Sequence, residues 1–305
     1  MDSPAVSIVV ATYNRSNVLK LAISSAVAQT FTDWEMIVVG DACTDDSEQV
    51  VGSFGDSRVH WTNLEVNHGD QSGPNNHGVA LARGRCIAYL NHDDLWFADH
   101  LERAMAMLEA TPGAGGVYSP AGIVDPDDGS VALGPSWTGR YEPNRVVAPA
   151  STWLLRRETV ERVGPWRARH ECHQAPSRDW LARAVRQGVE FAQVPYLTVL
   201  APQSGARPDS YRNRDEAEQR VLWERMRSEP AFREEVLAQA ALSAGAALVR
   251  PRPLGHAAQA LKDAVVMGFG SRWIPVKTAA RYRKKGGFVD DLRRIRGLPP
   301  HEHSS

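Results

Sequence analysis

Short apolar runs alternate with helical patterns over the first hundred residues. The runs over residues 7–11, 36–39 and 86–90 are continuous and mostly β-branched or aliphatic, which is typical of strands buried on both faces. Residues 18–27 carry their apolar side chains on one face at helical spacing, after a cap that we expect at Ser16 or Asn17. Strands separated by helices predict right-handed βαβ crossovers and a mainly parallel sheet.

The pattern is looser after Gly113. It predicts a strand over 115–118, a turn over 125–129, a strand at 153–155 that leads into a helix over 158–163, a helix over 180–185, and one or two short strands within 191–200. From about Tyr211 the pattern is helical. We therefore predict an α/β fold with a mainly parallel central sheet flanked by helices. Residues 1–210 form its domain, in halves of about 1–110 and 111–210, and residues 211–305 form a helical C-terminal region.

Composition excludes several classes of protein. The 305 residues are 43% hydrophobic, and 35 Lys and Arg against 36 Asp and Glu leave a formal charge of −1. This balance argues against a protein that binds nucleic acid through bulk charge. No apolar run approaches the roughly 18 residues of a membrane-spanning helix, and no basic leader precedes residues 7–12. Three widely spaced cysteines without a Cys-x-x-Cys motif fit neither a disulfide framework nor a zinc site, so we expect a cytoplasmic protein.

The C-terminal tail has a charge character of its own. From Arg250 onward it holds twelve Lys and Arg against four acids, with Trp273, Ile274 and Phe288 between them. One interpretation is a peripheral contact with anionic lipid at the inner face of the membrane, or with a lipid-linked acceptor. The other interpretation is a solvated helical tail, which is what most charge runs are.

Polar clusters follow the predicted strands. Residues 11–15 follow the first strand, 40–46 the second and 91–96 the third, and a fourth cluster spans 177–181. Ligands of open α/β sheets bind at the carboxyl ends of the strands, so the first three clusters are candidate site segments. The adjacent carboxylates of Asp93 and Asp94 favour a divalent cation that is held by one carboxylate together with substrate phosphates.

Each cluster also has a purely structural interpretation. The first is equally a capped turn between strand and helix, and Thr44 or Asp45 is placed to cap the following helix. The Asp93–Asp94 pair is placed to cap a helix that starts near Ala98, and Asp179 to cap the helix that follows it.

Taken in order, these segments resemble one known family. The segments 7–15 (SIVVATYNR), 37–47 (IVVGDACTDDS), 67–78, 84–96 and 178–180 are similar to the motifs of the GT-A fold, family 2 inverting glycosyltransferases. The resemblance covers roughly residues 5 to 205. It implies a GT-A, Rossmann-like domain whose first half binds the nucleotide and whose second half binds the acceptor.

The resemblance also implies a role for individual residues. The nucleotide-sugar-binding residues it implies are Ala11, Thr12, Tyr13, Arg15, Asp41, Asn76, Asn91, His92, Asp93 and Asp94. Among these, Asp41 contacts the base and Asp93 matches the last carboxylate of the DXD motif, the ligand of Mn²⁺ or Mg²⁺. Asp179 matches the catalytic base.

This chain departs from the family pattern at several positions. Gly40, Asn91 and Arg178 stand where acids are common, and Asn75 where arginine is common. The histidine that the family often carries after its last strands is missing near residues 202–204, where His170 or His173 is a candidate substitute. Trp137, Tyr141, Trp153 and Trp166 are candidates for stacking on a sugar, although core packing is the commoner role of such residues.

The implied activity is inverting transfer of a sugar from a nucleotide-diphosphate sugar, a UDP-sugar foremost, to an acceptor hydroxyl. It proceeds by metal-assisted direct displacement with Asp179 as general base, in surface polysaccharide or glycoconjugate assembly. The acceptor is a carbohydrate, a lipid-linked sugar or a protein. An alternative is a nucleotide-sugar-binding protein without turnover. A nucleotidyltransferase is disfavoured, because no glycine-rich, lysine-bearing phosphate loop lies near the N-terminus.

Overall fold

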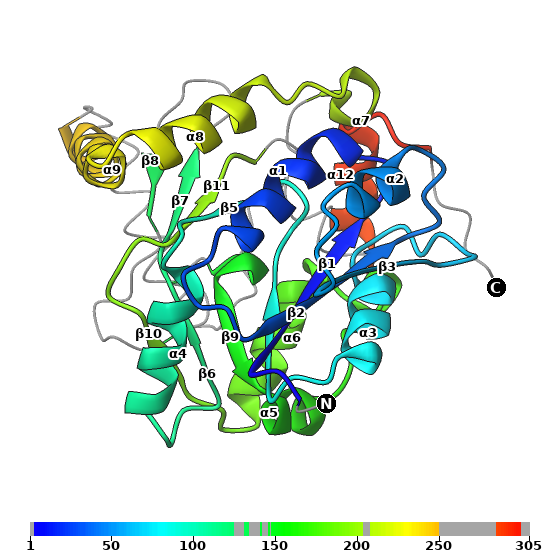
Figure 1. The fold of residues 1–305 in the computed structure, drawn as a ribbon, viewed down its shortest axis with the longest axis horizontal. Coiled ribbons are helices and arrows are strands. Elements are labelled where there is room, and N and C mark those ends of the chain that lie inside the picture. Colours follow the sequence, from blue (N-terminus) through cyan, green and yellow to red (C-terminus); the bar gives the residue numbers. More distant parts are fainter. Residues whose placement is uncertain are drawn as a thin grey trace.

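A computed structural model describes residues 3–124, 131–133, 141, 146, 148–203, 208–249 and 285–299. The turn predicted over 125–129, Trp137 and most of the basic tail lie outside these residues. Figure 1 shows the arrangement of the helices and strands.

The core of the fold is a seven-stranded sheet in the order β10-β6-β9-β4-β1-β2-β3. Its strands, in chain order, are β1 Val6–Thr12, β2 Trp34–Gly40, β3 Val59–Asn63, β4 Cys86–Tyr89, β6 Gly116–Tyr118, β9 Trp153–Arg156 and β10 Phe191–Gln193. Every neighbouring pair is parallel except the two that involve β9, which runs antiparallel to β4 and β6. The predicted fold class, a mainly parallel sheet with a helical C-terminal part, is confirmed.

A smaller sheet of four strands lies beside the central one, in the order β5-β11-β7-β8. Its strands are β5 Leu95–Trp96, β7 Ala121–Val124, β8 Val131–Ala132 and β11 Val199–Ala201. The described helices are α1 Ser16–Val27, α2 Ser47–Gly52, α3 Ser72–Leu81, α4 His100–Ala110, η1 Ala150–Thr152, α5 Arg157–Val163, η2 Arg169–Glu171, α6 Pro176–Arg186, α7 Ser210–Asn213, α8 Ala217–Ser228, α9 Phe232–Val249 and α12 Gly287–Ile295.

Both faces of the central sheet are covered, as the continuous apolar runs predict. Successive strand residues point to opposite faces, so Ile8 and Val10 pack on the side of α1 and α4, and Val9 packs on the side of α3, α5 and α6. All seven residues of β2 are buried. The result is a three-layer α/β/α arrangement in which the loops at the carboxyl ends of β1, β2 and β4 stay open to a ligand.

Aromatic side chains fill the layer between the sheet and α5 and α6. Trp153 packs on Trp166 and Trp180 at ring-centroid distances of 5.7 and 5.9 Å, and the Trp166 indole N–H donates to the Tyr89 hydroxyl at 3.0 Å. Trp153 and Trp166 are therefore core residues, the commoner of the two roles considered for them.

The helices after residue 210 pack on the same body. Phe232, Val236 and Ala240 of α9 join Leu95 and Leu200 of the smaller sheet in one buried cluster. Helix α12 follows residues that the structure does not describe, and Figure 1 shows it beside α7 at the end of the sheet toward which β1 points. None of the described helices is both long and apolar enough to cross a membrane.

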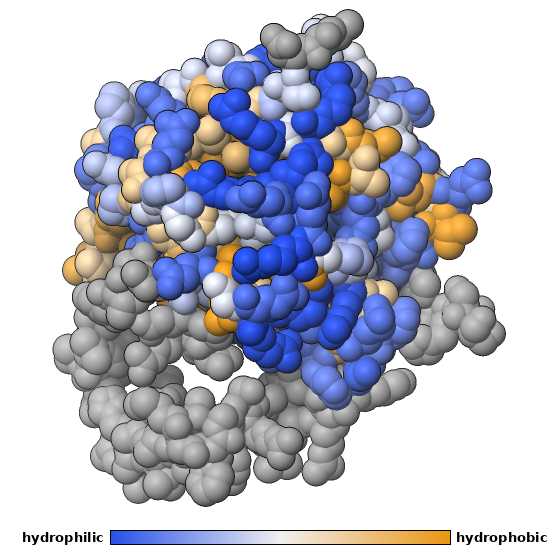
Figure 2. Space-filling model, turned by 90° about the horizontal axis from the view of Figure 1, so that it is seen from below, coloured by the Kyte–Doolittle hydropathy of each residue, from blue (hydrophilic) through white to orange (hydrophobic). Residues whose placement is uncertain are grey.

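The molecule seen from below in Figure 2 is hydrophilic across the middle of that face. Hydrophobic side chains gather there only in smaller groups beside the hydrophilic band. Among the described residues this face offers no broad apolar surface of the kind that marks a docking site.

A buried histidine predicts a pH-dependent stability. His100, at the start of α4, is fully buried, its Nδ1 lies 2.8 Å from the Thr198 hydroxyl, and burial lowers its pKa to about 3. In the unfolded chain a histidine has a pKa of about 6.5, so below that pH the unfolded state binds a proton that the folded state excludes. The folded state should lose stability as the pH falls from about 6.5, by roughly a factor of ten in the unfolding equilibrium per pH unit.

Urea unfolding of wild type and His100→Gln between pH 7 and pH 4 measures this effect. The variant should show a shallower fall of the unfolding free energy with decreasing pH. His60→Gln, which changes an exposed histidine, is the matched control. Parallel pH curves for wild type and His100→Gln would contradict the prediction.

Candidate active site

A cavity of about 300 Å³ opens at the carboxyl ends of β1, β2 and β4. Seven residues singled out in the sequence line it: Ala11, Thr12, Tyr13, Asp41, Asn91, His92 and Asp93. Three separate strand ends thus contribute to one site, because parallel strands finish at the same edge of the sheet.

Asp41, after β2, anchors one wall of the cavity. Its carboxylate accepts the backbone N–H groups of His68 at 2.8 Å and Gly69 at 3.0 Å, and its carbonyl accepts the Asn67 amide at 2.7 Å. Burial raises the pKa of Asp41, and the two N–H bonds oppose that rise. Asp41 Oδ1 also lies 3.1 Å from the His68 Nδ1, so Oδ2, whose protein partner is the Gly69 N–H, is the oxygen with room for a hydrogen bond from a ligand.

Asp93 and Asp94 have different surroundings although they are adjacent. Asp94 is buried, and one of its oxygens accepts the Asn91 amide at 2.8 Å and the Ser151 hydroxyl at 2.6 Å. Burial and the neighbouring Asp93 charge raise the pKa of Asp94 to about 7. Asp93 lines the cavity. Asp94 thus supports Asn91 from behind, and Asp93 is the carboxylate of this pair that is presented to a ligand.

His92 lies between β1 and the cavity. Its Nδ1 is 3.2 Å from the Ala11 carbonyl, and burial lowers its pKa. A carbonyl oxygen only accepts, so Nδ1 carries the hydrogen and donates it, which leaves Nε2 as an acceptor.

Arg15 does not line the cavity but supports a residue that does. It is 1% exposed, donates to the Ser210 carbonyl at 3.2 Å, and its guanidinium lies 5.1 Å from the ring centre of Tyr211. Tyr211 lines the cavity, 6.3 Å from the rings of both Tyr13 and His92. Tyr211 was not singled out in the sequence, where it marks only the start of a helical region.

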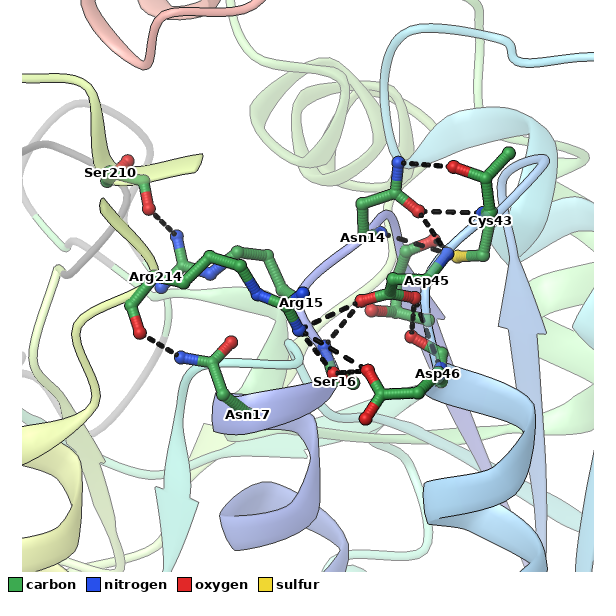
Figure 3. A network of polar contacts seen from close by, with 12 residues as sticks. Asn14, Arg15, Ser16, Asn17, Cys43, Asp45, Asp46, Ser210 and Arg214 are labelled. Atoms are coloured by element: carbon green, nitrogen blue, oxygen red, sulfur yellow. Dashed lines mark hydrogen bonds and ion pairs between the residues drawn. The ribbon is translucent and has the colours of Figure 1, made fainter. Parts of the chain in front are cut away.

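A network of polar contacts fixes the segment that carries Tyr211 (Figure 3). Arg214 pairs with Asp45 at 3.2 Å and also contacts the Ser16 hydroxyl, and Asn17 donates to the Arg214 carbonyl at 2.7 Å. The loops after β1 and β2 are thus tied to Ser210 and Arg214, 195 positions from Arg15 and 169 from Asp45.

The same network corrects the expected cap of α1. Neither Ser16 nor Asn17 caps this helix; Arg15 is its N-cap and makes no side-chain capping bond. Instead, Asp45 from the neighbouring loop accepts the N–H of Ser16 at 3.1 Å with one oxygen. Its other oxygen accepts the N–H of Ser47, the first residue of α2, although the N-cap of α2 is Asp46 and not Thr44 or Asp45. One carboxylate therefore satisfies the beginnings of two helices.

Two further predicted residues lie behind the lining. The Asn76 side chain exchanges hydrogen bonds with the backbone of Trp166, at 2.9 and 2.8 Å. Asp179 lies in the first turn of α6, paired with Arg183 at 2.9 Å and 3.9 Å from Arg167. Residues three apart on a helix share a face, so Asp179 is on the same side of α6 as Pro176, which lines the cavity.

Twelve further residues, none of them predicted as a site residue from the sequence, line the cavity from four segments over 69–74, 175–176, 211 and 289–298. They are Gly69, Asp70, Gln71, Pro74, Ala175, Pro176, Tyr211, Val289, Leu292, Arg293, Arg296 and Leu298. The last five belong to α12 or the residues just after it. The sequence identified the tail as basic, but the two interpretations considered for it were contact with lipid and exposure to solvent. Neither places its arginines in the cavity.

The described residues offer Asp93 as a metal ligand. Among them, no three His, Cys, Asp or Glu side chains converge on a point, and neither His170 nor His173 lines the cavity. A divalent ion that is held by one protein carboxylate and by substrate phosphates suits this arrangement, because Mg²⁺ commonly binds in that way.

Comparison with known proteins identifies a family for this part of the chain. Residues 7–147 match the family model described as glycosyl transferase family 2. The glucosyltransferase WfgD of Escherichia coli, named a UDP-Glc:α-D-GlcNAc-diphosphoundecaprenol β-1,3-glucosyltransferase, is 36% identical over 108 residues, which are 35% of this chain and 42% of WfgD. The chain thus matches less than half the length of that relative.

Two solved structures have a similar fold. TarS residues 1–349 of S. aureus, in complex with UDP-GlcNAc, matches with a TM-score of 0.55 at 17% identity, over 77% of this chain and 71% of TarS. The mannosyltransferase PcManGT of Pyrobaculum calidifontis, in complex with GDP-Man and Mn²⁺, matches with a TM-score of 0.55 at 18% identity, over 97% of this chain and 88% of PcManGT. At these identities the likeness concerns the fold.

Proposed function

Residues 7–147 match glycosyl transferase family 2 and confirm the resemblance predicted from the sequence; on that premise we propose that the protein is an inverting glycosyltransferase. It moves a sugar from a nucleotide-diphosphate sugar, a UDP-sugar foremost, to an acceptor hydroxyl. The observation that carries the proposal is the cavity in which Asp41, Asp93 and arginine side chains meet at the carboxyl edge of the sheet.

The nucleoside end of the donor is assigned to the loops after β1 and β2. Ala11, Thr12 and Tyr13 form one wall, and Asp41 accepts a hydrogen bond from the base. Its carboxylate is already oriented by the N–H groups of His68 and Gly69, so little freedom is lost when the base binds.

The diphosphate end is assigned to residues 91–93. Asn91, held by Asp94 and Ser151, and His92, held by the Ala11 carbonyl, present fixed polar groups to the ligand. Asp93 would hold Mn²⁺ or Mg²⁺ together with the diphosphate, and PcManGT, a structural neighbour, is solved with Mn²⁺. When bound, such an ion acts as a Lewis acid toward the charge that develops on the leaving diphosphate.

The acceptor is assigned to the side of the cavity formed by α6. Asp179 would take the proton of the acceptor hydroxyl as the oxygen attacks the anomeric carbon opposite the leaving diphosphate, which inverts that carbon. Arg183 and Arg167 hold the Asp179 carboxylate in position for this role. A lipid-linked or carbohydrate acceptor fits the proposal, because the name of WfgD specifies a diphosphoundecaprenol-linked sugar. Surface polysaccharide assembly, with peripheral contact to a membrane, is the corresponding setting.

Calorimetric titration of the whole protein with UDP, GDP and dTDP, with and without Mn²⁺, tests the proposal. One diphosphate should bind best, and its affinity should rise with Mn²⁺, because Asp93 and the phosphates share the ion. No binding of any of the three would contradict the donor site. Binding that ignores Mn²⁺ would contradict the role of Asp93.

Turnover distinguishes the transferase from a protein that only binds nucleotide sugars. Incubation with the matching nucleotide sugar and Mn²⁺ should release the nucleoside diphosphate slowly by hydrolysis, even without an acceptor. A tight complex with no release over many hours would favour the binding protein.

A further inference from the structure

The inner face of the C-terminal helix α12 is both basic and directed at the cavity. Val289, Leu292, Arg293 and Arg296 all line the cavity, and their spacing of three, four and seven residues puts them on one face of the helix. Arg294, on another face, has a side chain that is 75% exposed. The arginines of this helix are therefore divided between the cavity and solvent.

Contacts at both ends hold α12 in this position. At its start, the N–H of Gly286 donates to the Cys172 carbonyl at 2.8 Å, and Asp290 pairs with the buried Arg169. At its end, the N–H of Asp209 donates to the Ile295 carbonyl at 2.8 Å, which joins α12 to the segment that carries Tyr211.

A glycine turn completes the end of the helix. Gly297 has φ +75°, its N–H donates to the Arg294 carbonyl at 3.2 Å, and the N–H of Leu298 donates to the Arg293 carbonyl at 2.9 Å. These are the two hydrogen bonds of a Schellman motif, which ends the helix and turns Leu298 back toward the cavity. A side chain at position 297 would meet Asp209 at 2.5 Å as well as strain the backbone, so this turn requires glycine.

Arg293 is a buried cation on the wall of the cavity, in contact with Gly69. It is 7% exposed and donates to the carbonyls of Gly69 at 2.9 Å and Pro299 at 3.2 Å, while its Nε has no hydrogen-bond partner among the residues that the structure describes. Within the described residues it forms no ion pair, although the charges of Asp41 and Asp70 act on it. Burial of a charge without a close counterion costs desolvation free energy. An anionic ligand in the cavity would offset this cost by pairing with the Arg293 guanidinium.

Arg296 is the second cation that lines the cavity from this face of α12. Its guanidinium lies 5.8 Å from the ring centre of Tyr211, and its charge acts on both Tyr211 and His92. The Asp93 charge acts on the same two side chains. Arg296 therefore lies near the end of the cavity to which the diphosphate is assigned.

We propose that α12 is part of the donor site and that Arg293 and Arg296 bind the phosphates of the nucleotide sugar. This inference rests on the proposed function and adds to it a phosphate-binding element from the far end of the chain, beyond the residues that match the family. Part of the positive charge of the tail, that of Arg293 and Arg296, then contacts the substrate. Arginine suits the task because its guanidinium donates several hydrogen bonds to phosphate oxygens and stays charged.

The test compares single substitutions on one helix in the full chain. Arg296→Gln and Arg293→Gln should each weaken binding of UDP, or of whichever diphosphate wild type binds best, by about tenfold or more, since hydrogen bonds to a charged group are worth roughly 1.5–3 kcal/mol. The affinity for the corresponding nucleoside, which has no phosphate, should not change. Arg294→Gln removes the same charge from the exposed face of α12 and should leave both affinities unchanged.

A second readout separates phosphate binding from a structural role. Arg296→Lys, which keeps the charge but not the planar donor geometry, should recover part of the lost affinity, and the loss in Arg296→Gln should shrink as salt is raised because the contact is ionic. Thermal unfolding of Arg293→Gln shows whether that variant keeps its fold; if it unfolds early, the titration of Arg296→Gln decides the inference.

Three results are decisive. If Arg296→Gln and Arg293→Gln both bind the diphosphate like wild type, α12 has no part in phosphate binding. Equal loss of diphosphate and nucleoside affinity in Arg296→Gln would mean that the helix only shapes the pocket. Either result overturns this inference and leaves the proposed function intact, whereas failure of wild type to bind any nucleoside diphosphate overturns both.

Discussion

Asp179→Asn is expected to lower the rate of sugar transfer by about 10²–10⁴-fold, the usual contribution of a general base. The asparagine keeps the size of the side chain but cannot take the proton of the acceptor hydroxyl. Asp179 lies in the first turn of α6 on the same side as Pro176, while the residues assigned to the nucleotide lie on the loops after β1, β2 and β4. The dissociation constant of the nucleoside diphosphate should therefore stay the same, so the effect should fall on kcat.

The control for this substitution must also lose an ion pair between carboxylate and arginine. Glu229 pairs with Arg225 at 2.7 Å at the same four-residue helical spacing as Asp179 with Arg183, but on α8–α9, away from the cavity. Glu229→Gln should transfer sugar like wild type. A loss of diphosphate binding in Asp179→Asn would contradict the assignment of a base. A product with retained anomeric configuration, seen by NMR, would contradict direct displacement.

Asp93→Asn is expected to reduce kcat/KM by a comparable factor, about 10²–10⁴-fold, and to remove the effect of Mn²⁺ on nucleotide binding. The reason is that Asp93 is the carboxylate proposed to hold the ion, and charge stabilisation by a metal of several kcal/mol corresponds to such a factor. Asp94 cannot take its place without breaking its bonds to Asn91 and Ser151. Initial rates and calorimetric titrations over a range of Mn²⁺ concentrations measure both effects.

Asp33→Asn supplies the matched control. Asp33 is an exposed carboxylate just before β2, at the opposite edge of the sheet, and its removal changes the net charge by the same amount. It should leave the Mn²⁺ dependence as in wild type. If the Asp93→Asn variant still binds the diphosphate more tightly when Mn²⁺ is present, then the ion is held by other residues and the prediction is wrong.

Several elements of the fold followed directly from local pattern. β1, β2 and β4 lie within one or two residues of the predicted runs at most positions, because a strand buried on both faces needs an unbroken apolar sequence. The strand β3 was not predicted: its sequence, VHWTN, is short and only partly buried, so it carries no clear period. The antiparallel direction of β9 could not be predicted from the sequence either, because an apolar run has the same pattern whether its neighbours are parallel or antiparallel.

Seven of the ten residues that the resemblance assigned to the nucleotide line the cavity. The three others, Arg15, Asn76 and Asp94, hold backbone or side chains behind it. A motif identifies a segment that ends at the sheet edge, but alternate side chains of such a segment point in different directions. Which of Asp93 and Asp94 is presented to a ligand depends on Ser151, which is 57 residues away from Asp94.

The sequence by itself determined the α/β architecture, the three strand ends that build the site, and the family of residues 7–147, since these depend on contacts between neighbours in the chain and on motifs of a few residues. It also marked the tail as basic. Only the tertiary structure decided that Tyr211, Arg293 and Arg296 complete the cavity. Helical spacing determines which side chains of α12 share a face. Which surface this face packs against depends on long-range contacts, such as that of Arg293 with Gly69, 224 residues apart. No local sequence pattern encodes such contacts.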